Sequence, residues 1–494
     1  MSTPTTATTS AREHAVQLAP RALVFSGGRP ADGAGAPRSF THPADRSPIT
    51  TATLGTAADI DEAVKTARLA QPEWWSAGPS TRRETLLGLA ATIREHVADL
   101  AALVTLEMGM PIRASKAGVL HAAEWFSYYA GMADKLRGSA PAVSPPGRML
   151  NFTEHTPYGV VGAIIPWNGP MIALALKVAP ALAAGNAVVL KPSEIAPFSS
   201  LQFAELAHQA GLPAGLLNVV AGGADAGARL AEHPEVGIVS FTGGNLAGRA
   251  VAAAAAARHA PVILELGGKS ASIVFDDVDV KRTAKMSLLL GAVQNSGQGC
   301  FLPTRVLVQD SIYEEFVEQM VAAATQVVIG NPFDPAVTMG PVVNEAARAR
   351  IQAFVDRSVS DQDGRLVSHG AQPPSTGSHL SPAIFADTDP QSTLAQEEVF
   401  GPVLAVSRFT TEDEAIAIAN GTRFGLAGYV WTSDLARAHR VASRLEAGNV
   451  SINGMSALPP NAEFAGWHAS GPGSEGGESG FYEFLRTKSI NVQL

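Results

Sequence analysis

The sequence predicts an α/β protein that contains two parallel-sheet domains. From residue 158 onward, short apolar segments of strand length alternate with segments whose apolar residues recur at helical spacing. Strands that are regularly separated by helices form parallel sheets, and the helices cover both faces of such sheets. At 494 residues the chain is also too long for one hydrophobic core, so two or three domains are expected.

The first part of the chain is expected to be mainly helical. Residues 1–19 begin with a stretch rich in Ser, Thr and Ala, which predicts a disordered tail and no secretory signal. Apolar residues at helical spacing predict one helix from Ala58 to just before Pro72 and another that begins at Ser80. Residues 138–147 are rich in Pro, Gly and Ser, and this break predicts a loop or a projecting arm.

The middle of the chain carries the clearest alternation. Strands are predicted at 160–165, 187–190, 217–220, 236–241 and 262–265, with helices at 171–183, 199–209, from 225, and at 246–257. Ligands bind at the carboxyl ends of the strands in open parallel sheets. The residues that follow these strands are therefore the first candidates for a functional site: 166–168, 191–194, 222–223, 242–244 and 265–268.

A second mixed segment, residues 270–448, is expected to form another α/β domain. Its predicted strands are 304–308 and 403–409, and its predicted helices are 312–328 and 412–420. The last ten residues, 485–494, alternate weakly between apolar and polar. They are expected to form a strand that adds to the sheet of another chain.

Composition restricts the class of protein. The chain is 46% hydrophobic and 16% charged, which is typical of a globular protein with a large interior. Its formal net charge is −9 with no basic stripe, so nucleic acid and membrane surfaces are not expected partners. No apolar run reaches the roughly 20 residues of a membrane span, and one cysteine forms no internal disulfide. A cytoplasmic enzyme is predicted. The twelve histidines include no metal-binding motif, so no metal site is expected.

Cys300, the only cysteine, is the leading candidate for a nucleophile. A lone cysteine is more often a small buried apolar side chain. This one follows a run of small and polar residues, 295–299, which does not resemble a packed core. Small neighbours allow a substrate to approach the sulfur, and a nearby helix start would favour the thiolate.

Three further groups lie at predicted strand ends. Glu265 is either a carboxylate at the functional edge of the sheet or a solvated strand end. Asn168 is either an amide donor for a developing oxyanion or an ordinary turn residue. Lys191 and Glu194 would either bind a ribose, with the carboxylate disfavouring a 2′-phosphate, or form a surface ion pair.

Eight segments, taken in order, resemble the motifs of the aldehyde dehydrogenase superfamily from about residue 20 onward. These segments are 106–111, 166–168, 191–194, 241–244, 265–270, 297–300, 397–403 and 470–475. The resemblance implies a Rossmann-like NAD-binding domain formed by residues 20–137 and 157–265. It further implies a catalytic α/β domain, residues 266–471, and a small β oligomerisation domain, residues 138–156 and 479–494, in a homodimer or homotetramer.

The resemblance also implies catalytic roles. Cys300 would attack the aldehyde to give a thiohemiacetal whose oxyanion is held by Asn168 and the Cys300 backbone N–H. Hydride transfer to the nicotinamide would leave a thioester, and Glu265 would activate the water that hydrolyses it. The alternatives are a CoA-acylating semialdehyde dehydrogenase, which has no need of a water-activating base, and a non-catalytic protein on the same fold.

The implied cofactor is NAD, with NADP possible because Lys191 would also accept a 2′-phosphate. The implied cofactor contacts are Ile164, Ile165, Pro166, Trp167, Lys191, Ser193, Glu194, Gly223, Phe241, Gly243, Gly244, Gly248, Leu266, Glu398 and Phe400. The chain departs from the family at Gly244, where Ser is usual, and at Ala221, where Gly is usual. Near the C-terminus, residues 463–466 replace the usual Pro-Phe-Gly-Gly, and His468 stands where Lys is common.

The implied substrate contacts suggest a wide, apolar tunnel. They are Gly169, Ala173, Leu176, Phe301, Ser456, Leu458 and Phe464. Several of these positions carry bulky aromatic residues in relatives, and no arginine for a substrate carboxylate is evident. A bulky, hydrophobic or aromatic aldehyde is therefore expected in place of a small semialdehyde.

Overall fold

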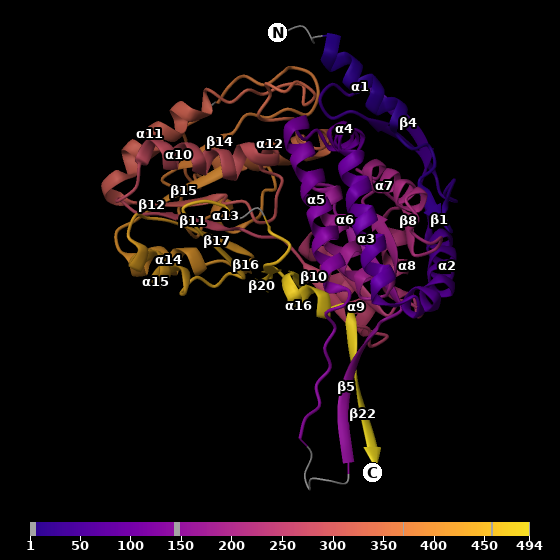
Figure 1. Cartoon of the computed structure of the whole chain (residues 1–494). Coiled ribbons are helices and arrows are strands. Elements are labelled where there is room, and N and C mark those ends of the chain that lie inside the picture. The colour runs from indigo at the N-terminus through magenta and orange to yellow at the C-terminus, as the bar shows by residue number, and fades with distance from the viewer. Residues whose placement is uncertain (1–5, 143–148, 369, 456–457, 494) are drawn as a thin grey trace.

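The computed structural model describes residues 6–142, 149–368, 370–455 and 458–493. Within these residues it confirms the α/β class as two mainly parallel, seven-stranded sheets (Figure 1). The first sheet has the order β10 (Val262–Glu265), β9 (Ile238–Thr242), β6 (Val160–Ile165), β7 (Ala187–Pro192), β8 (Leu217–Val220), β1 (Val24–Ser26) and β2 (Arg29–Ala31). Within this sheet only β1 runs against the other strands, because it pairs antiparallel with both β8 and β2.

The helices that connect these strands lie close to their predicted places. They are α6 (Pro170–Ala183), α7 (Phe198–Gln209), α8 (Ala224–Glu232) and α9 (Asn245–Ala256). Three of the five parallel strands have the predicted bounds; β7 ends two residues later than predicted, and β9 begins two residues later and ends one residue later. Short, continuously apolar segments bounded by turn residues explain this accuracy, because both faces of a parallel strand are covered.

The second sheet follows the first after a connection of five residues. Its order is β13 (Arg365–Leu366), β14 (Ala383–Ala386), β15 (Val403–Phe409), β12 (Arg305–Gln309), β11 (Ala271–Val274), β17 (Ala427–Trp431) and β18 (Asn449–Ile452). Its helices are α10 (Val280–Leu288), α11 (Tyr313–Ala324), α12 (Glu345–Ser360), α13 (Thr393–Gln396), α14 (Glu412–Asn420) and α15 (Leu435–Ala442). Because β10 leads directly into β11, the carboxyl edge of the first sheet meets the amino edge of the second.

The N-terminal region contains more structure than the sequence predicts. Its elements are α1 (Thr6–Leu18), α2 (Ala57–Ser76), α3 (Gly78–Glu95), α4 (Val97–Met108), α5 (Ile112–Met132) and the hairpin of β3 (Pro37–Thr41) and β4 (Pro48–Thr53). The prediction of a disordered tail is wrong for residues 6–18. Ala15 of α1 is fully buried, and His14 bonds Asp99 of α4 at 2.8 Å. Such tertiary contacts stabilise a helix whose own sequence is a weak signal. Residues 1–5 of the predicted tail lie outside the described residues.

Helix α2 also continues past the predicted end. Pro72 lies inside it, on an exposed face. Water can therefore replace the hydrogen bond that the missing backbone N–H of the proline would have made. Beyond it, the buried Trp74 donates its indole N–H to the carbonyl of Leu182 at 2.9 Å. This packing against the core stabilises the part of the helix that follows the proline.

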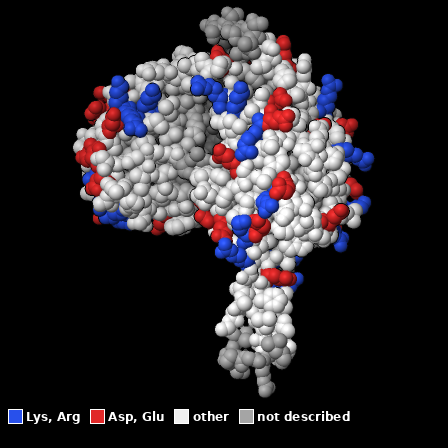
Figure 2. Space-filling model, in the orientation of Figure 1, with Lys and Arg blue, Asp and Glu red and all other residues white. Residues whose placement is uncertain are grey.

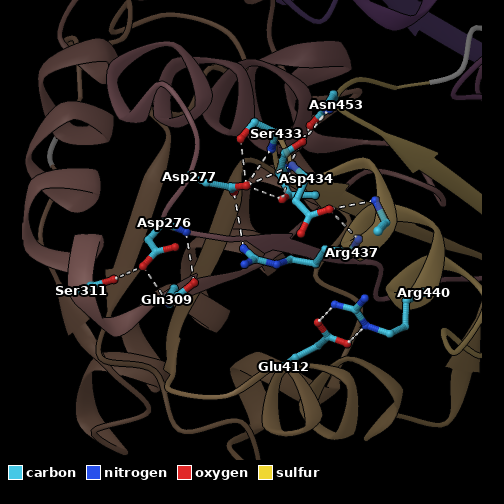
Figure 3. Close-up of polar contacts among 12 residues, drawn as sticks. Asp276, Asp277, Gln309, Ser311, Glu412, Ser433, Asp434, Arg437, Arg440 and Asn453 are labelled. Atoms are coloured by element: carbon cyan, nitrogen blue, oxygen red, sulfur yellow. Dashed lines mark hydrogen bonds and ion pairs between the residues drawn. The ribbon is translucent and has the colours of Figure 1, made fainter.

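The carboxyl edge of the second sheet is closed by polar side chains (Figure 3). Asp277, which follows β11, accepts hydrogen bonds from the hydroxyls of Thr432 and Ser433 at 2.8 and 2.9 Å. It also accepts the N–H groups of Ser433 and Asp434, both at 3.1 Å. Asn453, after β18, exchanges two hydrogen bonds with the backbone of Thr432. The ends of β11, β17 and β18 are thereby joined to the start of α15.

A two-stranded ribbon projects from the body of the protein (Figure 1). β5 (Met149–Pro157) pairs antiparallel with β22 (Leu485–Gln493) along their full length. The C-terminal strand expected to add to another chain thus already has one partner in its own chain. Two smaller pairs, β16 (Phe424–Gly425) with β20 (Trp467–His468) and β19 (Glu463–Ala465) with β21 (Ser474–Gly476), precede α16 (Gly477–Tyr482) at the base of the ribbon.

Charged side chains of both signs are interspersed over the face shown in Figure 2. Among the described residues, no helix is both long and apolar enough to cross a membrane.

Candidate active site

A cavity of about 340 Å³ lies at the carboxyl edge of the first sheet, where the second sheet meets it. Its walls come from the residues that follow β6, β7, β9 and β10 and from two loops of the second domain. The lining residues are Ile164, Ile165, Pro166, Trp167, Asn168, Lys191, Ser193, Phe241, Thr242, Gly243, Gly244, Ala247, Leu266, Gly267, Cys300, Glu398 and Phe400. The structure therefore brings Cys300, Asn168 and most of the expected cofactor contacts to one place.

Three expected cofactor contacts lie outside this lining. Glu194 is 3.6 Å from the Lys191 ammonium, measured from Oε2 to Nζ. Gly248 lies on α9 against Leu266, where a Cβ would come within 2.4 Å of the leucine Cδ2. Gly223 precedes α8. Thr242, Ala247 and Gly267 line the cavity although they were not among the expected contacts.

The expected substrate contacts that the structure describes are not among the residues that line this cavity. Gly169, Ala173 and Leu176 lie at the start of α6, and the rings of Phe301 and Phe464 meet edge-on with centroids 6.1 Å apart. The backbone carbonyl of Leu458 lies 2.8 Å from His121 Nε2. Ser456 lies outside the described residues.

The loop that carries Cys300 has an unusual backbone. Three consecutive residues, Asn295, Ser296 and Gly297, have φ values of 49°, 53° and 72°. Non-glycine residues rarely adopt this left-handed region, and such strain is retained where surrounding contacts impose it. A Cβ on Gly297 would come within 2.1 Å of the Gly401 carbonyl oxygen. The chain turns here, and Cys300 lines the cavity.

Hydrogen bonds hold this loop and Asn168 together. The Asn168 side-chain amide donates to the carbonyl of Gln298 at 3.0 Å. Asn295 donates to the carbonyls of Asn168 at 2.8 Å and Gln298 at 2.9 Å. The Gln298 side chain accepts the N–H of Val343 at 2.9 Å. A primary amide carries two N–H groups, and the second one of Asn168 has no partner among the described residues.

Electrostatics keep the resting nucleophile protonated. Burial raises the pKa of the Cys300 thiol, and the negative charges of Glu398 and Glu265 raise it further. The residue is half-buried overall, and it is exposed where it lines the cavity. A group that withdraws the proton, or a positive charge brought into the cavity, is therefore needed to form the thiolate.

Glu265, at the end of β10, is a buried carboxyl group that is 3% exposed. Burial raises its pKa well above the usual range; Glu475 raises it further, and Lys177 opposes both. Neither carboxyl oxygen makes a well-formed hydrogen bond with a described residue, although the nearby Gly466 N–H favours the anion slightly. Once ionised, a carboxylate with a raised pKa is a stronger proton acceptor than an ordinary one.

A buried ion pair that the sequence analysis did not identify lies behind Glu265. Lys177 of α6 places its ammonium 2.5 Å from a carboxylate oxygen of Glu475 and 2.9 Å from the Ser240 hydroxyl. The signal was present, because a lysine inside an otherwise apolar, fully buried helix requires a partner. The pair places a carboxylate and an ammonium close enough to Glu265 to act on its charge, Glu475 raising its pKa and Lys177 lowering it.

Glu398 enters the cavity from the second domain. Burial raises its pKa to about 7, and it accepts the N–H of Gly268 at 3.1 Å. Arg350 holds the adjoining loop by donating to the carbonyl of Val399 at 2.8 Å. Phe400 has a left-handed φ of 52°, and its ring meets that of Trp167 edge-on at 5.5 Å.

Comparisons with known proteins give the family of the chain. The model of the "Aldehyde dehydrogenase family" matches residues 32–490. A betaine aldehyde dehydrogenase of Cereibacter sphaeroides is 40% identical over 477 residues, covering 96% of this chain and 98% of that protein. An indole-3-acetaldehyde dehydrogenase of P. syringae, solved with NAD⁺ and IAA, superposes with a TM-score of 0.95 at 35% identity, covering 99% and 100%.

A betaine aldehyde dehydrogenase of Staphylococcus aureus, solved with NAD⁺, superposes with a TM-score of 0.94 at 33% identity, covering 98% of this chain and 97% of that one. Because the family model and these relatives span nearly the whole sequence, the resemblance inferred from the eight motifs is confirmed. The chain belongs to the aldehyde dehydrogenase family.

Proposed function

We propose that this chain oxidises an aldehyde to the carboxylic acid through a thioester on Cys300, with NAD as the hydride acceptor. One observation carries the proposal: the only cysteine of the chain and the amide of Asn168 line the same cavity at the edge of a Rossmann-like sheet. In two relatives the solved structures contain NAD⁺.

In the first step Cys300 releases its thiol proton to solvent, and the sulfur attacks the aldehyde carbon, so that the C–S bond of a thiohemiacetal forms as the carbonyl π bond breaks. The oxygen becomes an oxyanion, which the second N–H of Asn168 and the backbone N–H of Cys300 would stabilise. Glu398, Lys191 and Glu194 would hold NAD, which would supply the hydride acceptor. Loss of hydride from the thiohemiacetal carbon, with its two electrons, leaves the thioester.

In the second step water adds to the thioester carbon and Cys300 leaves. Glu265, whose pKa is raised by burial, would accept the proton from that water. The Lys177–Glu475 pair behind it would set how readily Glu265 ionises, because Glu475 raises the pKa of Glu265 and Lys177 lowers it. A CoA-acylating enzyme would need no such base, so the presence of Glu265 favours hydrolysis. In a non-catalytic protein the buried carboxyl group of Glu265 would have no role.

The residues around the cavity fit a dinucleotide. The N-terminus of α9, a helix of twelve residues, begins at the cavity and would face the pyrophosphate. Gly267 lies so close to Glu398 that a Cβ would approach its Oε2 to 2.5 Å, so the carboxylate reaches past bare backbone into the cavity. Glu398 would hold the nicotinamide ribose. Lys191 and Glu194 would hold the adenosine ribose, and the carboxylate favours NAD over NADP.

For the substrate we infer a bulky, hydrophobic or aromatic aldehyde. A Cβ on Gly169 would meet no atom within 4 Å, so the start of α6 leaves open space. Ala173 and Leu176 are small or unbranched at Cβ, and the Phe301–Phe464 ring pair offers an aromatic surface. Betaine aldehyde is the second candidate, because several curated relatives at about 40% identity carry that name.

A steady-state panel tests both parts. With NAD and with NADP, kcat/KM is measured for phenylacetaldehyde, betaine aldehyde and succinic semialdehyde. We expect phenylacetaldehyde with NAD to give the highest value. A best value for betaine aldehyde or the semialdehyde would contradict the substrate class. Cofactor reduction that survives Cys300→Ala would contradict the thioester mechanism itself.

We also propose that the ribbon of β5 and β22 joins copies of the chain into a homodimer or homotetramer in the cytoplasm. Isolated two-stranded ribbons are marginally stable, and open strand edges favour pairing. Leu150 and Val492 of the ribbon are 46% and 38% exposed. Light scattering coupled to gel filtration would give the mass, and a monomer at micromolar concentration would contradict this assembly.

A further inference from the structure

The residue after the nucleophile, Phe301, is held by a side chain that the sequence did not single out. Tyr429 lies in β17, opposite Ser272 of the neighbouring strand β11, and is 2% exposed. Its hydroxyl donates to the backbone carbonyl of Phe301 with an O–O distance of 2.6 Å. This distance is at the short end of the range for O–H···O hydrogen bonds.

The position of Tyr429 in the strand explains why it reaches the nucleophile loop. Side chains alternate across a strand, so Tyr429 shares a face with Trp431, which packs with residues of α10 and α11. Tyr429 lies two residues closer than Trp431 to the amino edge of the sheet, and that edge meets the cavity. The loop that ends at Phe301 crosses this edge before β12 begins.

The hydroxyl remains a donor over the working pH range. Burial raises the pKa of Tyr429, and the nearby Cys300 raises it further. The phenol is therefore protonated whenever the enzyme is active. Because Tyr429 is buried, a water molecule would not readily replace its hydroxyl at the Phe301 carbonyl.

The Phe301 side chain depends on the orientation of this backbone. Its ring meets that of Phe464 at an interplanar angle of 81°, with the centroids 6.1 Å apart. Phe464 comes from β19, a separate element, so the pair forms only if the Phe301 backbone is correctly placed. A shift of about 1 Å in a positioning group is enough to cost about 100-fold in rate.

We propose that Tyr429 is a positioning residue that sets aldehyde selectivity, by fixing the Phe301 carbonyl and with it the Phe301–Phe464 ring pair beside Cys300. The inference rests on the proposed function and deepens it. According to this inference, the Tyr429 hydroxyl on β17 fixes the shape of one wall of the substrate site.

The test is Tyr429→Phe, which removes only the hydroxyl. Its matched control is Tyr313→Phe. Tyr313 is also fully buried and donates its hydroxyl to a backbone carbonyl, that of Val406 at 3.1 Å, and it belongs to α11. Melting temperature, NAD affinity by calorimetry, and kcat and KM for phenylacetaldehyde and acetaldehyde are measured for both variants.

We expect Tyr429→Phe to lower kcat/KM for phenylacetaldehyde about tenfold, mainly through KM, because one buried hydrogen bond is lost. The value for acetaldehyde should change less than about threefold, because a small substrate makes fewer contacts with the ring wall. Tyr313→Phe should keep the wild-type ratio of the two substrates. A wild-type ratio in Tyr429→Phe, or the same loss of selectivity in Tyr313→Phe, would overturn the inference.

Phe301→Ala tests the contribution of the Phe301 ring apart from any effect of Tyr429 on the fold. It should lower the selectivity itself, and adding Tyr429→Phe should change the ratio no further, since interacting residues are non-additive. Full additivity of the two changes would show that Tyr429 acts through something other than the Phe301 ring. This cycle remains informative if Tyr429→Phe alone loses stability.

Failure of the proposed function would be visible separately, as a wild-type protein that reduces no NAD with any aldehyde. Alkylation of the single cysteine by iodoacetamide, followed by intact mass, still tests the positioning. Without the hydroxyl the loop should loosen and expose Cys300, making alkylation about threefold faster. Equal rates in the wild type, Tyr429→Phe and Tyr313→Phe would overturn the inference.

Discussion

At the carboxyl edge of the first sheet, the chain leaves its strands through glycines and small turns that surround a cavity of about 340 Å³. At the carboxyl edge of the second sheet, Asp277 and Asn453 fill the equivalent place with hydrogen bonds to the Thr432–Asp434 turn (Figure 3). The two sheets have the same number of strands in the described residues, and both are mainly parallel. Only the first leaves its edge open.

This contrast refines a general rule. Parallel sheets bind ligands at their carboxyl edge because helix N-termini and free backbone N–H groups gather there. In the second sheet those groups are already satisfied by short polar side chains. That sheet instead contributes to the cavity from its amino edge, through the loops that carry Cys300 and Glu398. An edge is functional where its backbone is bare and structural where Asp, Asn and Ser side chains occupy it.

The largest effect should come from removing the base at the open edge. Glu265→Gln is expected to leave the first turnover intact and to slow the steady state by about 10³-fold, since thioester hydrolysis loses its base. A burst of NADH followed by slow turnover, measured by stopped-flow absorbance, would show this. Steady turnover equal to that of the wild type would assign the base elsewhere.

The pH profile of the wild type checks the same residue. Burial raises the pKa of Glu265, and only its ionised form accepts a proton. The kcat should therefore rise with pH as Glu265 ionises and level off above its pKa. In Glu265→Gln this rising limb should disappear, because the amide does not titrate. A limb that persists in the variant would belong to another group.

A smaller effect is expected from the oxyanion donor at the same edge. Asn168→Ala removes the amide whose second N–H would stabilise the reacting oxygen, and should lower kcat by about 10²-fold. The burst itself should slow here, which distinguishes this variant from Glu265→Gln. An unchanged burst rate would mean that Asn168 only supports the Gln298 carbonyl that it bonds at 3.0 Å.

The sealed edge should respond in stability alone. Asp277→Ala leaves four donors to find water, at a cost of about 1–2 kcal/mol in the free energy of unfolding. Urea denaturation measures this loss, while kcat/KM should stay within about twofold of the wild type. A large loss of activity with normal stability would give the second carboxyl edge a functional role and would break the comparison.

The sequence predicted the open edge well, for a physical reason. The strands from 160 to 265 are short, apolar and bounded by turn residues, so their ends and the residues after them could be placed from the pattern alone. Contacts between distant segments could not be placed in this way. Lys177 and Glu475 lie 298 residues apart, and Tyr429 and Phe301 lie 128 residues apart. Only the folded chain brings these pairs together.

Helix α1 shows the same limit of prediction from local sequence. The sequence of residues 6–18 has few large apolar side chains, and the segment was expected to be disordered. Its stability comes from Ala15 packed against the body and from Arg12, which forms an ion pair with Asp45 at 2.9 Å. Local pattern describes a helix poorly where tertiary contacts supply most of its free energy.

The smallest effect is expected at Gly244, at the open edge of the first sheet. Gly244 precedes α9, and a Cβ there would meet no atom within 4 Å. Its φ and ψ of −72° and 151° suit a serine, which is also a favourable N-cap. Gly244→Ser should therefore tighten NAD binding by about threefold, because the added hydroxyl would reach the pyrophosphate at the helix N-terminus.

Calorimetric titration with NAD measures this gain, and Gly248→Ser is the matched control. At Gly248 a Cβ would come within 2.4 Å of Leu266 Cδ2, so the same side chain should weaken binding there by displacing a wall of the cavity. Tighter binding in the first variant and weaker binding in the second would show that the cofactor edge is open at one glycine and packed at the other. Weaker binding in Gly244→Ser would instead mean that the pyrophosphate approaches the bare backbone so closely that even one hydroxymethyl group is excluded.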